Sequence, residues 1–320
     1  MNSSKSHSRY HAPSPRIVVL GSINMDLVLC CETLPVAGQT LIARSSNEYC
    51  GGKGANQAVA AALAGGDVAM LGGVGDDAFA TRLVDNLKIH EVDCDAVHRF
   101  PGTASGLAVI AVDSVGQNSI MVVPGANSKI STNSVQAAEK QIKESDCLMV
   151  QLETPSETIL KGLSLARLHG VRVVLDPAPA PVDLIPSLLQ VDLICPNETE
   201  AAALTQLPVT NTTEAETAAK KLQDLGATNV VITMGSQGAL LLQDKNAVLV
   251  PAIPIDTIDT TAAGDAFAGA LAVRWAQTDD LLDAVKFANV AGAIAASRRG
   301  AQNSIGTKQE IDDLLLRQAK

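Results

Sequence analysis

The sequence predicts an α/β fold with a Rossmann-like, mostly parallel sheet, helices on both of its faces, and a small additional β-sheet. From residue 148 onward, short apolar runs alternate with helix-like stretches, which is typical of parallel sheets. Residues 106–123 instead carry two apolar runs around a polar turn, as in a β-hairpin. Aromatic residues form only 2% of a chain that is 47% hydrophobic. Small aliphatic side chains must therefore fill the core, which suits closely packed layers.

The first part of the chain contains short elements in quick succession. A buried strand is predicted over 17–20, and a second apolar run over 27–31 follows too soon for a helix between them. An Ala-rich segment with glycines on both sides predicts a helix over 55–64. A strand is expected over 68–71 and a helix over 78–89.

The remainder of the chain is more regular. Strands are expected over 148–152, 171–175, 193–195, 230–233 and 239–242. Helices are expected over 131–143, 156–169, 198–206, 213–225, 262–276, 280–298 and 308–318. No internal repeat or linker is visible, so we expect a disordered tail over 1–16 and one α/β domain over 17–320. Segments of about 25–50 and 97–125 are expected to form the small sheet.

Composition argues against several classes of partner. The chain has 24 Lys and Arg residues against 34 Asp and Glu residues, a net charge of −10, whereas nucleic-acid-binding proteins usually present a basic face. No apolar run approaches the length of about 18 residues that spans a membrane. We therefore expect neither a nucleic-acid nor a membrane partner. The six cysteines include no C-x-x-C pair and predict reduced thiols in a cytoplasmic protein.

The segment 259–269, DTTAAGDAFAG, has the strongest chemical pattern. The small residues Ala262, Ala263 and Gly264 lead into a helix, whose first amides and dipole favour an anion. Asp265 follows within the first turn, where its carboxylate could accept a proton from an attacking hydroxyl. Taken alone, Asp265 is equally explained as a helix cap.

A second segment, 51–57 (GGKGANQ), opens the Ala-rich helix. Its glycines allow close approach of a ligand to the backbone, and Lys53 and Asn56 offer hydrogen-bond donors. The segment is not a P-loop, because G-x-x-x-x-G-K-[ST] does not occur. A glycine-rich turn before a helix, without a ligand, is the simpler interpretation of this segment alone.

Two further pairs of polar residues are candidates for ligand binding. Asn24 and Asp26 lie two apart in an extended segment, so their side chains point to the same side and could hold adjacent sugar hydroxyls. Asn197 and Glu200 lie three apart at a predicted helix start. Glu200 could bind Mg²⁺, or it could simply be an acidic residue of the first helical turn.

In this order, the segments resemble the ribokinase family of carbohydrate kinases, the PfkB type. Segment 51–57 resembles the first signature of the family, and 259–269 resembles the second. Further segments that match in order are 151–153, 177–180, 196–200, 233–238 and 300–304. The match covers roughly residues 17 to 318. It implies ATP-dependent phosphorylation of the 5-hydroxyl of D-ribose.

The resemblance also implies roles for individual residues. Asp265 would be the catalytic base, and the amides of Ala262, Ala263 and Gly264 would form the anion hole. The sugar pocket would be lined by Asn24, Asp26, Gly52, Lys53, Asn56, Glu153 and Asp265. ATP would be held by Asn197, Thr233, Gly235, Ser236, Gly238, Gly264 and Asn289. Glu200 would associate with Mg²⁺, and an activating K⁺ would lie among Asp259, Thr261, Ala295, Arg298, Gly300 and Ser304. The small sheet would form a lid over the sugar and an interface of a homodimer.

The sequence departs from residues frequent in the family at Asp176, Ala268 and Gly306, which leaves the sugar specificity and the potassium loop open. Deoxyribokinases, fructokinases and nucleoside kinases are alternatives within the family. A non-catalytic sugar-binding protein on the same fold would be expected to lose the base or the anion hole. A dehydrogenase would carry G-x-G-x-x-G after the first strand, and that fingerprint is absent.

Overall fold

A computed structural model describes residues 14–181, 183 and 185–318. Most of the predicted tail, residues 1–13, lies outside the described residues. The first strand begins at Arg16, one residue before the predicted start of the domain.

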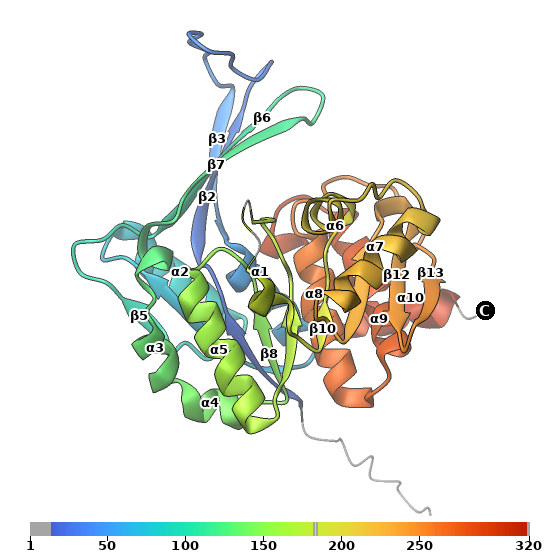
Figure 1. Ribbon diagram of the computed structural model, residues 1–320. Helices are drawn as coiled ribbons and strands as arrows, with labels where there is room; N and C mark the ends of the chain where they lie inside the picture. The colour runs from blue at the N-terminus through green and yellow to red at the C-terminus, as the bar shows by residue number, and fades with distance from the viewer. Residues whose placement is uncertain (1–13, 182, 184, 319–320) are drawn as a thin grey trace, which may run out of the picture.

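A large sheet forms the centre of the molecule (Figure 1). Within the described residues its nine strands are arranged in the order β13-β12-β11-β10-β9-β8-β1-β4-β5. The strands are β1 (Arg16–Leu20), β4 (Asp67–Val74), β5 (Val97–Arg99), β8 (Cys147–Val150), β9 (Arg172–Leu175), β10 (Leu193–Ile194), β11 (Asn229–Thr233), β12 (Ala239–Gln243) and β13 (Asn246–Val250). Pairing is parallel from β5 to β11, whereas β12 pairs antiparallel with both β11 and β13. The predicted fold class is confirmed.

Helices cover both faces of this sheet (Figure 1). They are α1 (Lys53–Leu63), α2 (Ala78–Ile89), α3 (Thr132–Ala137), α4 (Glu139–Lys143), α5 (Ser156–His169), α6 (Glu198–Thr205), α7 (Thr212–Asp224), α8 (Ala263–Thr278), α9 (Leu281–Ala296) and α10 (Lys308–Gln318). The helix predicted over 131–143 is divided into α3 and α4 at Ala138. Among the described residues, every helix is too short or too polar to cross a bilayer.

Two hydrophobic cores lie on opposite faces of the sheet. Helices α1, α2, α8, α9 and α10 contribute to one core, and α3 to α7 contribute to the other. Alanines such as Ala268, Ala272 and Ala288 are buried where α8 packs against its neighbours. Their small side chains allow close approach of the helices, which explains how a chain with few aromatic residues fills its interior.

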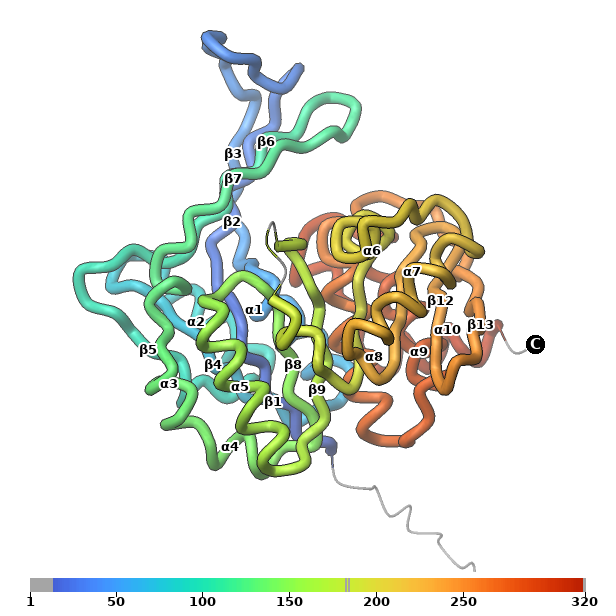
Figure 2. Tube along the Cα trace, viewed as in Figure 1, coloured from blue at the N-terminus to red at the C-terminus, as the bar shows by residue number. Residues whose placement is uncertain are grey.

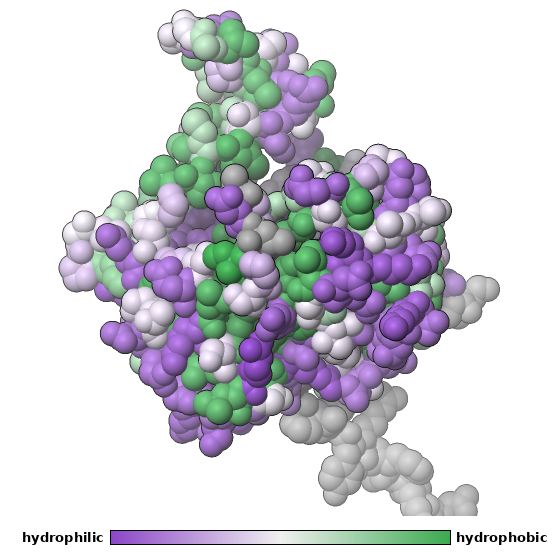
Figure 3. All heavy atoms as spheres, in the orientation of Figure 1, coloured by the Kyte–Doolittle hydropathy of each residue, from purple (hydrophilic) through white to green (hydrophobic). Residues whose placement is uncertain are grey.

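A second, smaller sheet projects from the body (Figure 2). Its order is β3-β2-β6-β7, with β2 (Asn24–Cys30), β3 (Ser45–Gly51), β6 (Gly106–Val112) and β7 (Asn118–Val123). The predicted hairpin is confirmed, because β6 and β7 pair antiparallel. The expected range 97–125 was wrong at its start: residues 97–99 form β5, which pairs with β4 at the edge of the large sheet. Figure 3 shows apolar residues along the small sheet, where β7 exposes Ile120, Met121, Val122 and Val123.

Candidate active site

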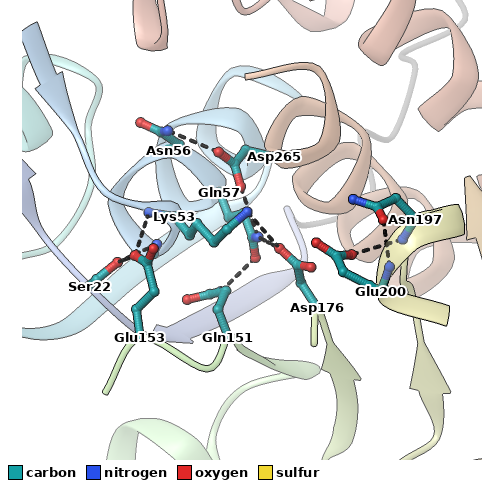
Figure 4. Close-up of polar contacts among 11 residues, drawn as sticks. Ser22, Lys53, Asn56, Gln57, Gln151, Glu153, Asp176, Asn197, Glu200 and Asp265 are labelled. Atoms are coloured by element: carbon teal, nitrogen blue, oxygen red, sulfur yellow. Dashed lines mark hydrogen bonds and ion pairs between the residues drawn. The ribbon is translucent and has the colours of Figure 1, made fainter. Parts of the chain in front are cut away.

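The candidate site lies at the carboxyl ends of the parallel strands, where open α/β sheets usually bind their ligands. Polar residues follow the ends of four neighbouring strands: Ser22 after β1, Glu153 after β8, Asp176 after β9 and Asn197 after β10. Figure 4 shows that their side chains converge with those of the first turns of α1 and α8. The sheet thus brings together residues separated by more than half of the chain.

Gly52 brings the start of α1 into this site. It has a φ of 89°, and a Cβ at this position would lie 2.7 Å from the backbone nitrogen of Asn24. Only glycine fits both the left-handed backbone and this close approach. Helix α1 begins at the next residue, so Lys53, Asn56 and Gln57 project from its first turns toward the strand ends.

Asp265 is buried in the first turn of α8, and its carboxylate is held by α1. Asn56 donates from Nδ2 to Oδ2 over 2.9 Å, and Gln57 donates from Nε2 to Oδ1 over 3.1 Å. The N-cap of α8 is Ala262, without a side-chain hydrogen bond. Asp265 therefore does not cap its helix, and each of its oxygens retains a lone pair for a further donor.

Gln57 joins Asp265 to a wider buried network. Its Nε2 also donates to Oδ2 of Asp176 over 2.7 Å, and its Oε1 accepts from Nε2 of Gln151 over 2.6 Å. On the other side, Gln302 donates from Nε2 to Oδ1 of Asn56 over 3.0 Å. These contacts fix the orientation of both amides that hold the Asp265 carboxylate.

Carboxylates dominate the electrostatics of the site. Burial raises the pKa of Asp26 to about 7, and nearby Glu153 and Asp265 add to this effect. Burial also raises the pKa of Asp176 to about 7, although Lys53 opposes the rise. The Lys53 ammonium lies 3.9 Å from Asp176. Burial alone would lower the pKa of Lys53, but Asp265, Asp176 and Glu153 together hold it above its usual value.

The start of α8 faces open space. A Cβ added at Gly264 would meet no atom within 4 Å. The amide of Ala263 donates to the carbonyl of Thr260 over 3.2 Å. For the amides of Gly264 and Asp265, the described part of the chain supplies no hydrogen-bond partner. These groups at the positive end of the α8 dipole are suited to an anionic ligand.

A cavity of about 720 Å³ adjoins the start of α8. All seven residues that the resemblance assigned to ATP line it: Asn197, Thr233, Gly235, Ser236, Gly238, Gly264 and Asn289. Asn289 donates from Nδ2 to the carbonyls of Val250 and Pro251 and so fixes one wall. The sequence did not single out the apolar part of the lining, which includes Ile253, Ile255 and Phe267.

A smaller cavity of about 370 Å³ lies beneath the small sheet and is lined by Asn24 and Glu153 together with Asn127 and Thr154. Glu153 accepts hydrogen bonds from Oγ of Ser22 and from the backbone amide of Lys53. Asp26 is buried two residues after Asn24 on the same face of β2. Of the seven residues assigned to the sugar by resemblance, Asn24 and Glu153 line this cavity. Lys53 contacts Glu153 through its backbone amide, and Asn56 contacts Asp265.

Asn197 and Glu200 lie at a helix start, as one of the two interpretations made from the sequence expected. They form a reciprocal capping box at the start of α6: Asn197 N donates to Glu200 Oε2 over 2.8 Å, and Glu200 N donates to Asn197 Oδ1 over 2.9 Å. One oxygen of Glu200 is left without a hydrogen bond from the described residues. A carboxylate oxygen of this kind suits Mg²⁺, directly or through water.

Two of the residues expected around K⁺, Asp259 and Gly300, connect the loop before α8 with the loop after α9. The carboxylate of Asp259 accepts from the backbone and hydroxyl of Thr261 and from the backbone amide of Gly300. These hydrogen bonds lower the pKa of Asp259, although burial opposes them. The side chain of Arg298 pairs with Glu310. Only the backbone carbonyl of Arg298 could therefore be a ligand of K⁺. The carboxylate, hydroxyl and carbonyl oxygens gathered here suit a hard cation.

Two residues in this region had not been singled out from the sequence. Gln57 lies within segment 51–57, but no sequence pattern indicates that it contacts Asp265. Asn127, in a short 3₁₀ turn after β7, contacts Asn24. Both are polar and almost fully buried, and burial of this kind is visible only after folding.

Comparison with known proteins agrees with this geometry. The model of the pfkB family carbohydrate kinases matches residues 14–308. The chain is 37% identical to a ribokinase of Haemophilus influenzae and 37% identical to a deoxyribokinase of Salmonella typhi. Both matches cover 93% of this chain and 98% of the relative.

Solved structures lead to the same family. An Arabidopsis thaliana ribokinase, complexed with ribose and ATP, superposes with a TM-score of 0.87 at 30% identity, covering 95% of this chain and 99% of the other. A Thermotoga maritima ribokinase gives a TM-score of 0.85 at 34% identity, covering 94% and 99%. Because the sequence motifs, the fold and these similarities agree over nearly the whole chain, the protein belongs to the pfkB family of carbohydrate kinases.

Proposed function

We propose that this protein transfers the γ-phosphoryl group of ATP to the 5-hydroxyl of D-ribose, forming ribose 5-phosphate and ADP. The position of Asp265 carries the proposal: it lies in the first turn of α8, next to Gly264 of the larger cavity. It also contacts Asn56 of α1, and the first residue of α1, Lys53, contacts Glu153 of the smaller cavity. A base at this junction can reach a sugar hydroxyl while a phosphate lies against the α8 amides.

The reaction follows from these positions. The Asp265 carboxylate takes the hydroxyl proton as the sugar oxygen forms its bond to the γ-phosphorus. The bond from the γ-phosphorus to the bridging oxygen breaks, and its electron pair leaves with ADP. Amides at the start of α8, including that of Gly264, stabilise the charge on the transferred group. Asn56 and Gln57 hold the base in place through their amino groups.

Two cations complete the proposal. Mg²⁺ would associate with Glu200, and K⁺ with the oxygens of the Asp259 and Gly300 loops, including Thr261, Ala295, Arg298 and Ser304. When bound, these cations would offset phosphate charge and fix the loop before α8, respectively. The chain already connects the Gly300 loop to the base, because Gln302 of that loop holds Asn56, which holds Asp265.

We further propose that the small sheet acts as a lid over the sugar and as a homodimer interface. The β2 strand carries Asn24 and Asp26 at its base, so movement of the sheet would alter the sugar site. The exposed Met121 and its neighbours on β7 would be covered by a second copy. A cytoplasmic location agrees with a supply of ATP and with the six unpaired cysteines.

A deoxyribokinase is the second candidate, because a relative of that name is as similar as the Haemophilus influenzae ribokinase. ATP turnover with D-ribose, 2-deoxyribose, fructose and adenosine, each in potassium and in sodium buffer, separates these functions. Turnover that is fastest with ribose supports the proposal. Turnover that is fastest with another acceptor keeps the proposed reaction and changes only the proposed substrate. Binding of sugar and ATP without turnover would instead indicate a non-catalytic binding protein.

A further inference from the structure

We propose that Asn127 is a positioning residue for the sugar: it orients the side-chain amide of Asn24 so that the amino group of Asn24 serves as a hydrogen-bond donor in the sugar cavity. The inference rests on the proposed function and assigns a role to a residue that the family signatures leave out. Asn127 lies in the 3₁₀ turn Gly125–Lys129, which returns from β7 to the body of the protein. It is only 1% exposed.

The backbone of Ile23 determines which way the Asn127 amide faces. Oδ1 of Asn127 accepts from the Ile23 N–H over 2.9 Å, and Nδ2 donates to the Ile23 carbonyl over 3.3 Å. A backbone N–H can only donate, so the end of the amide that faces it must be the oxygen. The amino group of Asn127 is thereby directed toward the Ile23 carbonyl and the neighbouring Asn24.

This orientation is passed on to Asn24. Nδ2 of Asn127 donates to Oδ1 of Asn24 over 2.7 Å. The side-chain oxygen of Asn24 therefore faces Asn127. The amino group of Asn24 has no hydrogen-bond partner in the described parts of the chain, and Asn24 lines the 370 Å³ cavity beside Glu153. The cavity thus combines a donor with a carboxylate acceptor. A sugar hydroxyl, which both accepts and donates, matches this combination.

Gly106 makes room for the pair. It lies opposite Asn24 in the pairing of β2 with β6. A Cβ at position 106 would lie 2.1 Å from Oδ1 of Asn24 and 2.3 Å from Nδ2 of Asn127. Any other residue would therefore force the two amides apart. The contact lies at the first residues of β2 and β6. It therefore also connects this end of the small sheet to the turn that contains Asn127.

The variant Asn127→Asp tests this inference with little change of shape. The introduced carboxylate still accepts from the Ile23 N–H but has no donor for Asn24, so Asn24 would turn its amino group toward that carboxylate and its oxygen toward the sugar. We expect the KM for the sugar to rise about tenfold, as for one lost hydrogen bond, while the KM for ATP stays within about twofold. Asn133→Asp, an exposed residue on α3, adds the same charge and should leave both constants unchanged.

A double-substitution cycle shows whether Asn127 acts through Asn24. If it does, Asn127→Asp should change the sugar KM less than about twofold when Asn24 is already alanine. If the fold-changes in sugar KM of the two single substitutions multiply in the double variant, the two residues act independently. That result would overturn the inference and would indicate a direct effect of the new charge. If Asn127→Asp does not fold, Gly106→Ala separates the same two amides without altering either, and an unchanged sugar KM in that variant would contradict the proposal.

A spectroscopic measurement separates this inference from the proposed reaction. In protein labelled with ¹⁵N-asparagine, the side-chain NH₂ signals of Asn24 are identified by their loss in Asn24→Ala. They should shift in Asn127→Asp and stay in place in Asn133→Asp. If the parent protein phosphorylates none of the sugars, the kinase proposal fails, yet shifted signals would still support the amide orientation. Signals unaffected by Asn127→Asp would refute it, whatever the turnover.

Discussion

Replacing Asp265 with asparagine tests the central assignment most directly. Both oxygens of the carboxylate accept hydrogen bonds, from Asn56 over 2.9 Å and from Gln57 over 3.1 Å. An amide at this position cannot take the proton of the sugar hydroxyl, and it also turns one acceptor into a donor. Loss of a general base typically lowers the rate about 10²- to 10⁴-fold, which corresponds to about 3–5 kcal/mol in the activation barrier.

The same substitution has a calculable effect on stability. If Gln57 reversed its side-chain amide, it would lose its hydrogen bonds to Asp176 at 2.7 Å and from Gln151 at 2.6 Å. Asn56 is fixed by Gln302, whose Nε2 donates to its oxygen. One donor would therefore face another donor, and a buried group left without its partner costs about 1–3 kcal/mol. Asp265→Asn should fold with this modest loss of stability.

The assay combines two measurements on each variant. Initial rates at saturating ATP and ribose report the chemical step, and urea unfolding reports the free energy of unfolding. Asp224→Asn, at the exposed end of α7, makes the same chemical change away from the site and should leave both values unchanged. A folded Asp265→Asn protein that retains more than about a tenth of the parent rate would refute the assignment of Asp265 as the base.

Three further predictions concern the surrounding structure. Asp259→Ala should abolish the stimulation by potassium while leaving the rate in sodium nearly unchanged; an undiminished response to potassium would remove Asp259 from the cation site. The pKa of Asp176 is raised to about 7 in the fold, so the folded state holds more protons than the unfolded state between pH 4 and 7, and stability falls as pH rises through that window. Asp176→Asn should reduce this fall by up to about 4 kcal/mol, and urea unfolding with the same pH dependence as the parent would contradict the raised pKa. If the proposed interface forms, the parent should sediment as a dimer and Met121→Asp on β7 as a monomer, and a parent that is already monomeric would rule out the proposed interface.

Much of the architecture followed from local patterns. Periodicity predicted α5 (Ser156–His169) and α10 (Lys308–Gln318) at their observed bounds, because an amphipathic helix carries its burial pattern in its own residues. Two strands were not predicted, the three-residue strand β5 and the edge strand β13. Neither has a strong apolar alternation, and each is defined by the strand that it pairs with.

The sequence by itself determined the family, the glycines that open α1 and the small residues that open α8, because these depend on backbone geometry close to each residue. It could not determine which side chains meet. Asn56 and Gln57 contact Asp265 across 209 and 208 positions of the chain, and Asn127 contacts Asn24 across 103. Such contacts exist only once parallel strands bring their carboxyl ends to one edge of the sheet. Burial then makes each polar partner necessary, since an amide or carboxylate removed from water must find its hydrogen bonds within the protein.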